Sequence, residues 1–149
     1  MTGIPTAAPV AVVDTSALLA FFDRKEPEHA GCRAAMAVVS HAVVSPMVLA
    51  ELDYMLTTAL GADPAQRALD YVLEKVAVRR FEIPETEPHL AAARAVMRRY
   101  PDIGLTDAMN AALAAEFRTD VLLTLDRKHF RTLRPLTAHG AYRLFPDDM

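Results

Sequence analysis

Short apolar runs alternate along this chain with stretches of helical composition, and this alternation constrains its fold most. Residues 10–13 form a Val-rich run, the pattern of a strand buried on both faces. We expect further extended segments at residues 42–44, 76–83, 121–125 and 141–145. Strands separated by helices indicate an α/β fold, a three-layer α/β/α sandwich whose central sheet is parallel or mostly parallel. Ligands of such sheets bind beyond the carboxyl ends of the strands.

The helices between these runs have recognisable ends. Ser45 followed by Pro46 predicts a helix start, with Ser45 as the N-cap and Pro46 at the first helical position. Gly61 predicts the end of that helix. The expected helices are residues 15–22, 28–39, 46–60, 63–74, 85–100 and 106–117.

Composition narrows the class of protein. A chain of 149 residues that is 52% hydrophobic predicts one domain, residues 1–149, with its own core. Cys32 is the only cysteine, so an intramolecular disulfide and a Cys-based zinc site are excluded. Residues 1–9 contain no Lys or Arg, and Asp14 interrupts the apolar run that follows. We therefore expect neither a signal peptide nor a membrane span, and a cytoplasmic location.

The net charge of −3 argues against a protein that grips nucleic acid over a broad surface. The basic residues are mostly Arg and are clustered at residues 79–80, 94–99 and 127–134. Guanidinium groups suit phosphate contacts, but Arg on surface helices also serves solubility, so both interpretations stay open. Arg127 and Lys128 flank Asp126 and are candidates for phosphate contacts.

Asp14 and Asp126 each follow an apolar run that we expect to be a strand. Each could be the N-cap of the helix that comes next. If the two strands are neighbours, however, both carboxylates lie at one edge of the sheet. Two caps would explain them separately, whereas one site explains them together.

Glu51 and Asp107 are the other candidate site residues. Glu51 falls well inside its expected helix, too far from the N-terminus to gain much from the helix dipole, at the edge of an apolar stripe. We expect it to be partly buried and to need a partner, for which an Arg is the alternative to a metal. Asp107 opens a helix, where an acid is favourable in any case, and Thr106 could be its cap.

Four carboxylates in one pocket repel one another, and a divalent cation removes that repulsion. An all-oxygen ligand set favours Mg²⁺, with Mn²⁺ as the alternative, over Zn²⁺. Such a site can activate water and stabilise charge on a phosphate without a Ser, Cys or His nucleophile. The candidate metal and catalytic residues are therefore Asp14, Glu51, Asp107 and Asp126.

Four segments resemble, in order, the motifs of PIN domains, which are small metal-dependent ribonucleases. They are residues 12–18 (VVDTSAL), 45–52 (SPMVLAEL), 104–108 (GLTDA) and 124–130 (TLDRKHF), and together they span nearly the whole chain. The length of the chain resembles the VapC-type toxins of bacterial toxin–antitoxin pairs.

This resemblance implies a five-stranded parallel sheet in an α/β/α sandwich, usually dimeric. It implies Mg²⁺-dependent RNA cleavage and inhibition by a small cognate antitoxin. It also makes the four carboxylates the metal-binding set, with Asp14 and Asp107 as the firmest ligands and Asp126 the least certain. The hydroxyls of Ser16 and Thr124 would orient the carboxylates.

Two other functions stay open. The fold could be kept as a catalytically silent RNA- or protein-binding regulatory module, although an inactive site has no reason to keep four repelling acids. The chain could also be a phosphohydrolase with Asp14 as nucleophile. Enzymes of that type usually carry a second Asp two positions on, where this chain has Ser16.

For several residues near the motifs we expect structural roles and no part in catalysis. We expect His129 to stabilise the turn beside Phe130, and Asp23 and Asp102 to be solvated loop residues. Five of the seven methionines are core residues or part of a groove for a partner, which the sequence does not decide. These are Met36, Met47, Met55, Met97 and Met109.

Overall fold

The computed structural model describes residues 8–149 and has a parallel sheet at its centre. Its strands are β1 (Val10–Val13), β2 (His41–Val43), β3 (Phe81–Glu82), β4 (Val121–Leu123) and β5 (Arg143–Phe145), in the spatial order β3-β2-β1-β4-β5. Every neighbouring pair is parallel. The expected α/β class is confirmed, with a sheet that is parallel throughout the part of the chain described.

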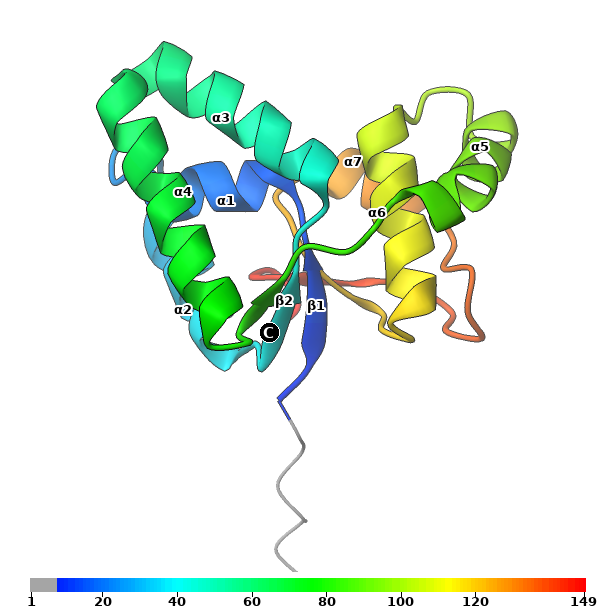
Figure 1. Cartoon of the computed structure of the whole chain (residues 1–149). Coiled ribbons are helices and arrows are strands. Elements are labelled where there is room, and N and C mark those ends of the chain that lie inside the picture. The colour runs from blue at the N-terminus through cyan, green and yellow to red at the C-terminus, as the bar shows by residue number, and fades with distance from the viewer. Residues whose placement is uncertain (1–7) are drawn as a thin grey trace, which may run out of the picture.

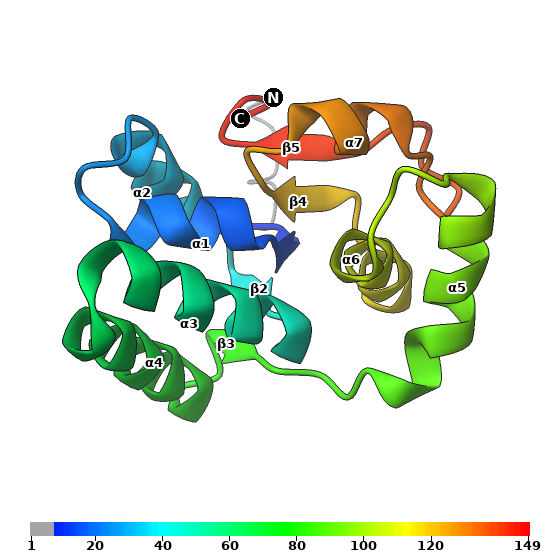
Figure 2. The ribbon, with the colours of Figure 1, turned by 90° about the horizontal axis from the view of Figure 1, so that it is seen from above.

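Helices cover both faces of this sheet (Figure 1). They are α1 (Thr15–Phe22), α2 (His29–Val38), α3 (Pro46–Leu60), α4 (Ala62–Ala77), α5 (Leu90–Arg99), α6 (Leu105–Glu116) and α7 (Arg127–Thr132), with a short 3₁₀ turn η1 (Glu87–His89). Helices α1 to α4 lie on one side, and α5 to α7 on the other (Figure 2).

Alternation along the strands builds the two cores between these layers. Ala11 and Val13 of β1 pack with α1 to α4, while Val12 between them packs with Ala108 and Leu113 of α6. Successive side chains of a strand point to opposite faces, so a strand covered by helices on both sides must be apolar throughout. This explains why β1 is a continuous apolar run.

The chain changes side after β3, and this places the site. From β1 it moves outward through β2 to β3, then crosses to α5 and α6 and returns to β4, on the other side of β1. The carboxyl ends of β1 and β4 therefore flank the point where the strand order reverses, the usual place for a ligand in such sheets. The register joins Val13 to Leu123, and the Asp14 amide donates to the Leu123 carbonyl at 2.9 Å.

Helix boundaries agree with the sequence where a capping residue marks them. The Ser45 side chain accepts a hydrogen bond from the Met47 amide at 3.1 Å, and Gly61 ends α3 with a φ of +100°. That φ suits glycine, which has no Cβ to clash.

Expected boundaries are wrong in several places: the strands expected at residues 121–125 and 141–145 are shorter, and the two largest differences lie on either side of β3. Residues 76–83 are not one extended segment, because α4 continues to Ala77 and strand β3 covers only Phe81–Glu82. The helix expected from residue 85 begins as η1 at Glu87 and becomes α-helical only at Leu90. Pro88 explains this delay, since it disfavours helical geometry in the residue before it and is tolerated only in a first turn.

Within residues 8–149, no helix is both long and apolar enough to cross a membrane. The expectation that residues 1–9 hold no signal peptide falls mostly on residues 1–7, which lie outside the described residues.

Candidate active site

All four candidate carboxylates line one pocket of about 660 Å³ at the carboxyl ends of β1 and β4. They come from the end of β1, the middle of α3, the first turn of α6 and the start of α7. The complete lining is Asp14, Thr15, Ser16, Ala50, Glu51, Tyr54, Met55, Asp107 and Asp126. The fold therefore brings together residues that are up to 112 positions apart in the sequence, Asp14 and Asp126 being the extremes (126 − 14).

Asp14 is buried and its carboxylate is held by three side chains. One oxygen, Oδ2, accepts from Thr124 Oγ1 at 2.8 Å and from Ser16 Oγ at 3.0 Å, and Oδ1 accepts from Asn110 Nδ2 at 3.4 Å. Asp14 occupies the N-cap position of α1, but its side chain makes no capping hydrogen bond, so capping does not account for the carboxylate. Ser16 and Thr124 do orient it. Burial raises the pKa of Asp14 despite these hydrogen bonds.

Asp107 lies in the first turn of α6, as expected. Burial, followed by the negative charges of Asp14 and Asp126, raises its pKa from 3.8 to about 7. Thr106 does not cap this helix, because Gly104 occupies the N-cap position and the Thr106 hydroxyl is turned to Glu51 instead.

Glu51 differs from the expectation in both its burial and its partners. The residue is exposed rather than half-buried. Its Oε1 accepts from Thr15 Oγ1 at 2.7 Å and its Oε2 from Thr106 Oγ1 at 3.1 Å. The alternative of an Arg partner is wrong, because hydroxyls from α1 and α6 orient this carboxylate and leave its negative charge uncompensated.

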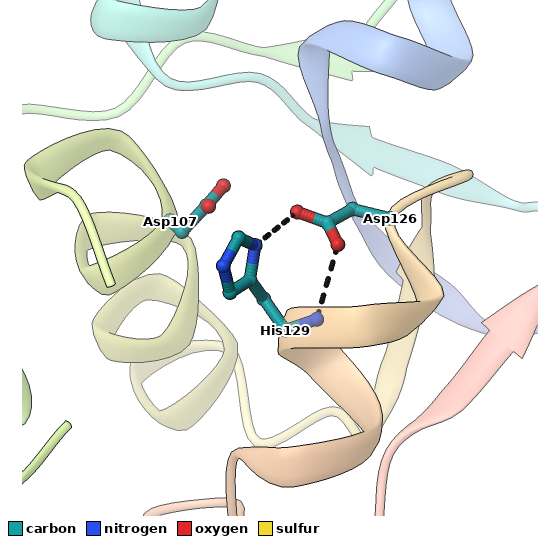
Figure 3. Close-up of side chains that lie close together, drawn as sticks. All are labelled: Asp107, Asp126 and His129. Atoms are coloured by element: carbon teal, nitrogen blue, oxygen red, sulfur yellow. Dashed lines mark hydrogen bonds and ion pairs between the residues drawn. The ribbon is translucent and has the colours of Figure 1, made fainter. Parts of the chain in front are cut away.

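Asp126 caps α7, so the capping interpretation is confirmed here even though the residue also lines the pocket. Its Oδ1 accepts from the His129 amide at 3.1 Å, and its Oδ2 accepts from His129 Nδ1 at 2.7 Å. The His129 ring stands beside Asp107 as well as Asp126 (Figure 3). The hydrogen bond to Asp126 raises the pKa of His129. His129 does stabilise its local turn, but it also lies close to two carboxylates of the pocket, Asp107 and Asp126.

Asn110 is a site residue that sequence reasoning missed. Its side chain is 1% exposed and donates to Asp14, while its Oδ1 is a buried oxygen without a hydrogen-bond partner among the described residues. One signal could have found it: Asn110 lies three residues after Asp107, on the same helix face, within an otherwise apolar buried run.

The charge balance of the pocket suits a cation. Within residues 8–149, Asp14, Glu51 and Asp107 form no ion pair. Arg127, beside Asp126, is directed to Asp147 and Glu28 instead. Oxygen donors of this kind, with the pKa raised at Asp14 and Asp107 and a spare amide oxygen nearby, fit a hard divalent cation.

The remaining candidates lie elsewhere. Asp102 is an exposed turn residue, as expected, but Asp23 is buried and accepts from the Lys25 amide at 3.0 Å. Met36 and Met109 are core residues, and Met47 and Met97 pack against the core beside α6. Met55 is 40% exposed and lines the pocket.

Comparison with known proteins identifies the family of this chain. The sequence model of the PIN domain matches residues 11–134. Ribonuclease VapC26 of Mycobacterium tuberculosis is 41% identical over 139 residues, which is 91% of this chain and 99% of the relative.

Two solved structures share the fold. VapC20 of M. tuberculosis, described as a toxin that cleaves the sarcin–ricin loop, superposes with a TM-score of 0.70 over 80% of this chain and 91% of that one, at 18% identity. VapBC2 of Rickettsia felis, bound to a DNA fragment from its promoter, gives 0.62 over 85% and 95%, at 20% identity. Together, the PIN match along most of the chain and the 41% identity to a ribonuclease show that this chain belongs to the PIN-domain family, among the VapC-type ribonuclease toxins.

Proposed function

We propose that this chain, acting as one nuclease domain over residues 1–149, is a Mg²⁺-dependent endoribonuclease of the cytoplasm that hydrolyses phosphodiester bonds in RNA. One observation carries the proposal: four carboxylates from four separate elements line one pocket, and within the described residues no Lys or Arg pairs with them. A chain that left such charges without a cation would have a destabilising site and no gain from it.

The pocket residues have different roles in this proposal. Asp14, Glu51 and Asp107 hold Mg²⁺ or Mn²⁺, and Asp126 completes the acidic set at the rim. A divalent cation bound there supplies Lewis acidity toward a phosphate oxygen and lowers the pKa of a water. Hydroxyls of Thr15 and Thr106 orient Glu51, and those of Ser16 and Thr124 orient Asp14. These two carboxylates therefore need little reorganisation when substrate binds.

The exposed arginines of α5 support RNA as the substrate. Arg94, Arg98 and Arg99 lie on the helix that packs against α6, whose first turn carries Asp107. None of the three is in an ion pair within residues 8–149. Guanidinium groups at such positions can bind phosphates on either side of the cleavage point without reading the base sequence.

Apolar surface supports a protein partner, for which we propose a small cognate antitoxin. Helices α3 and α4 enclose a groove of about 250 Å³ lined by Leu52, Leu56 and Val72, with Leu69 47% exposed at its edge. The name VapBC2 of the R. felis structure joins VapB to VapC, and this supports a VapB-like partner for the present chain. Homodimer formation is also expected and is measured by light scattering of the purified chain.

The experiment for the activity compares Asp14→Ala and Asp107→Ala with wild type on cellular RNA, with the cleaved ends mapped. Both variants should lose cleavage while circular dichroism shows an intact fold. Asp70→Ala, an exposed change on α4, is the matched control and should keep full activity. Full cleavage by both pocket variants would defeat the proposal.

The alternative is a silent module that binds RNA or protein without cutting. Purified wild type that binds RNA, but cleaves none with either Mg²⁺ or Mn²⁺, would favour that alternative. The antitoxin has its own test, in which Leu69→Asp should prevent neutralisation by the co-expressed partner without changing cleavage by the free toxin.

A further inference from the structure

The rim of the acidic pocket contains a nitrogen donor in addition to its carboxylates. Asp107, Asp126 and His129 each offer a ligand atom, and these three atoms lie within 4.8 Å of one another. The ring of His129 stands beside both carboxylates (Figure 3). A site of four carboxylates needs no imidazole for charge balance, so the position of this ring requires its own explanation.

The carboxylate of Asp126 is hydrogen-bonded to His129 through both of its oxygens. Its Oδ1 accepts from the His129 main chain at 3.1 Å and its Oδ2 accepts from the ring nitrogen Nδ1 at 2.7 Å. Each oxygen of Asp126 thus already carries a hydrogen bond from the same residue. Asp14 and Glu51, by contrast, take their hydrogen bonds from side chains outside the set of metal ligands. Asp126 is therefore better placed to hold the ring than to bind an ion directly.

The hydrogen bond also selects the form of the imidazole. A carboxylate can only accept, so Nδ1 carries the hydrogen, and in the neutral ring Nε2 then has the free lone pair. No hydrogen bond of Nε2 occurs among residues 8–149. Histidines that bind metals nearly always donate their other nitrogen to a carboxylate or carbonyl in this manner, which fixes the ring and makes the free nitrogen a stronger donor.

We propose that His129 binds the divalent cation of this site through Nε2, and that Asp126 is its positioning residue. This inference rests on the proposed function, because it concerns the ion of the same pocket. One imidazole in an oxygen site favours transition metals over Mg²⁺, since nitrogen is a softer donor and the affinity order of these ions rises from Mn²⁺ onward. The site should hence prefer Mn²⁺ to Mg²⁺ by more than its carboxylates alone would give.

Pulsed electron paramagnetic resonance of Mn²⁺ bound to the RNA-free protein tests the contact directly. Wild type should show the modulation that a directly coordinated imidazole ¹⁴N produces, and His129→Gln should lose it while still binding Mn²⁺. His139→Gln is the matched control: an exposed histidine bonded to Thr137, which should leave the signal unchanged.

Competition between the two ions gives a second readout. His129→Gln should lower the Mn²⁺ affinity about 10-fold or more, with a smaller change for Mg²⁺, so the preference for Mn²⁺ falls. Asp126→Asn keeps an oxygen that can cap α7 but weakens the hold on the ring, so it should weaken and broaden the nitrogen signal without removing it. Thermal melts of each variant show whether the fold is kept.

The outcomes separate this inference from the proposed function. Wild type that binds Mn²⁺ and cleaves RNA but shows no ¹⁴N coupling, or a His129→Gln protein with unchanged ion preference, overturns the assignment of His129 alone. Wild type that binds neither Mn²⁺ nor Mg²⁺ overturns both.

Discussion

Two groups of carboxylates in this molecule have opposite electrostatic surroundings. The pocket carboxylates are Asp14, Glu51, Asp107 and Asp126, and the pKa is raised at Asp14 and Asp107. The paired aspartates are Asp120, Asp147 and Asp148, whose pKa values are lowered by Arg143, Arg127 and Arg131 respectively. The ionisable group is a carboxyl in both sets, and the partners differ.

The paired aspartates serve the fold. Arg131 holds Asp148 through two hydrogen bonds, at 2.6 and 2.8 Å, and Arg143 of β5 holds Asp120 just before β4. Asp148 also accepts from the Leu144 amide at 2.7 Å and so ties the C-terminal residues to the last strand. In the pocket, Asp14 and Glu51 accept from hydroxyls and an amide instead, which orient the oxygens but cancel no charge, and Asp126 is bonded to His129. Charge is thus neutralised where it supports structure and left free where an ion is expected.

The largest effect should come from adding the ion. At about 100 times its dissociation constant, a cation adds roughly 2.7 kcal/mol to the free energy of unfolding, which for a domain of this size raises Tm by about 5–10 °C. Asp107→Asn should abolish most of that rise and, because it removes a half-buried unpaired charge, should also raise the Tm of the metal-free protein. Calorimetry with EDTA and with Mn²⁺ measures both. An equal rise of Tm on adding Mn²⁺ to wild type and to Asp107→Asn would contradict the proposed difference between the two groups of carboxylates.

The second effect is a dependence of metal-free stability on pH. The pKa of Asp107 is about 7 in the folded protein against 3.8 ordinarily, so the folded state binds the proton more tightly than the unfolded chain. Its contribution is present below the ordinary value and is lost as pH rises to about 7. Urea unfolding in EDTA should therefore show stability falling across this window, with a flatter slope for Asp107→Asn. Parallel slopes for the two proteins would contradict the raised pKa.

A smaller effect should follow the loss of one hydroxyl. Thr124→Val removes the 2.8 Å bond to Asp14 and the acceptor of the Asp126 amide. At about 0.5–1.5 kcal/mol per hydrogen bond, Mn²⁺ affinity should fall roughly 2- to 12-fold, and its pH profile should move to higher pH because Asp14 ionises less readily. Calorimetric titration of Mn²⁺ at several pH values measures this. Thr58→Val, which removes an exposed hydroxyl of α3, should change neither quantity.

The smallest effect belongs to the paired group. Asp148→Asn should lower the free energy of unfolding by about 1 kcal/mol or less, since the pair is largely solvent-exposed, and should leave cleavage unchanged. The pKa of Asp148 is about 2, so its contribution is present above its ordinary value and is lost as pH falls toward 2. Urea unfolding of the variant at neutral and acidic pH measures it. Loss of RNA cleavage in Asp148→Asn would show that the two groups are not separate.

Local sequence was a good guide wherever one residue type decides the backbone. The apolar run of β1, the Ser45 cap with Pro46 and the stop at Gly61 lie where they were expected. Helix α5 begins later than the expected residue 85 because Pro88 disfavours helical geometry in the residue before it. The sequence itself contains this information. The end of α4 was misplaced because residues 76–83 alternate like a strand, while packing and the left-handed backbone at Arg79 decide the boundary.

The candidate site divides in the same way. The sequence by itself determined which four carboxylates are the candidate metal ligands, because their spacing within ordered motifs is a property of the chain. Only the tertiary structure decided what each one does: Asp14 is held by Thr124 from another strand, Glu51 is exposed and bonded to Thr15 and Thr106, and Asp126 both caps a helix and holds His129. The contact of Asn110 with Asp14 became visible only in the folded structure. Hydrogen-bond partners, burial and pKa depend on segments that meet in space, and the adjacency of β1 and β4 is set by the packing of the whole sheet.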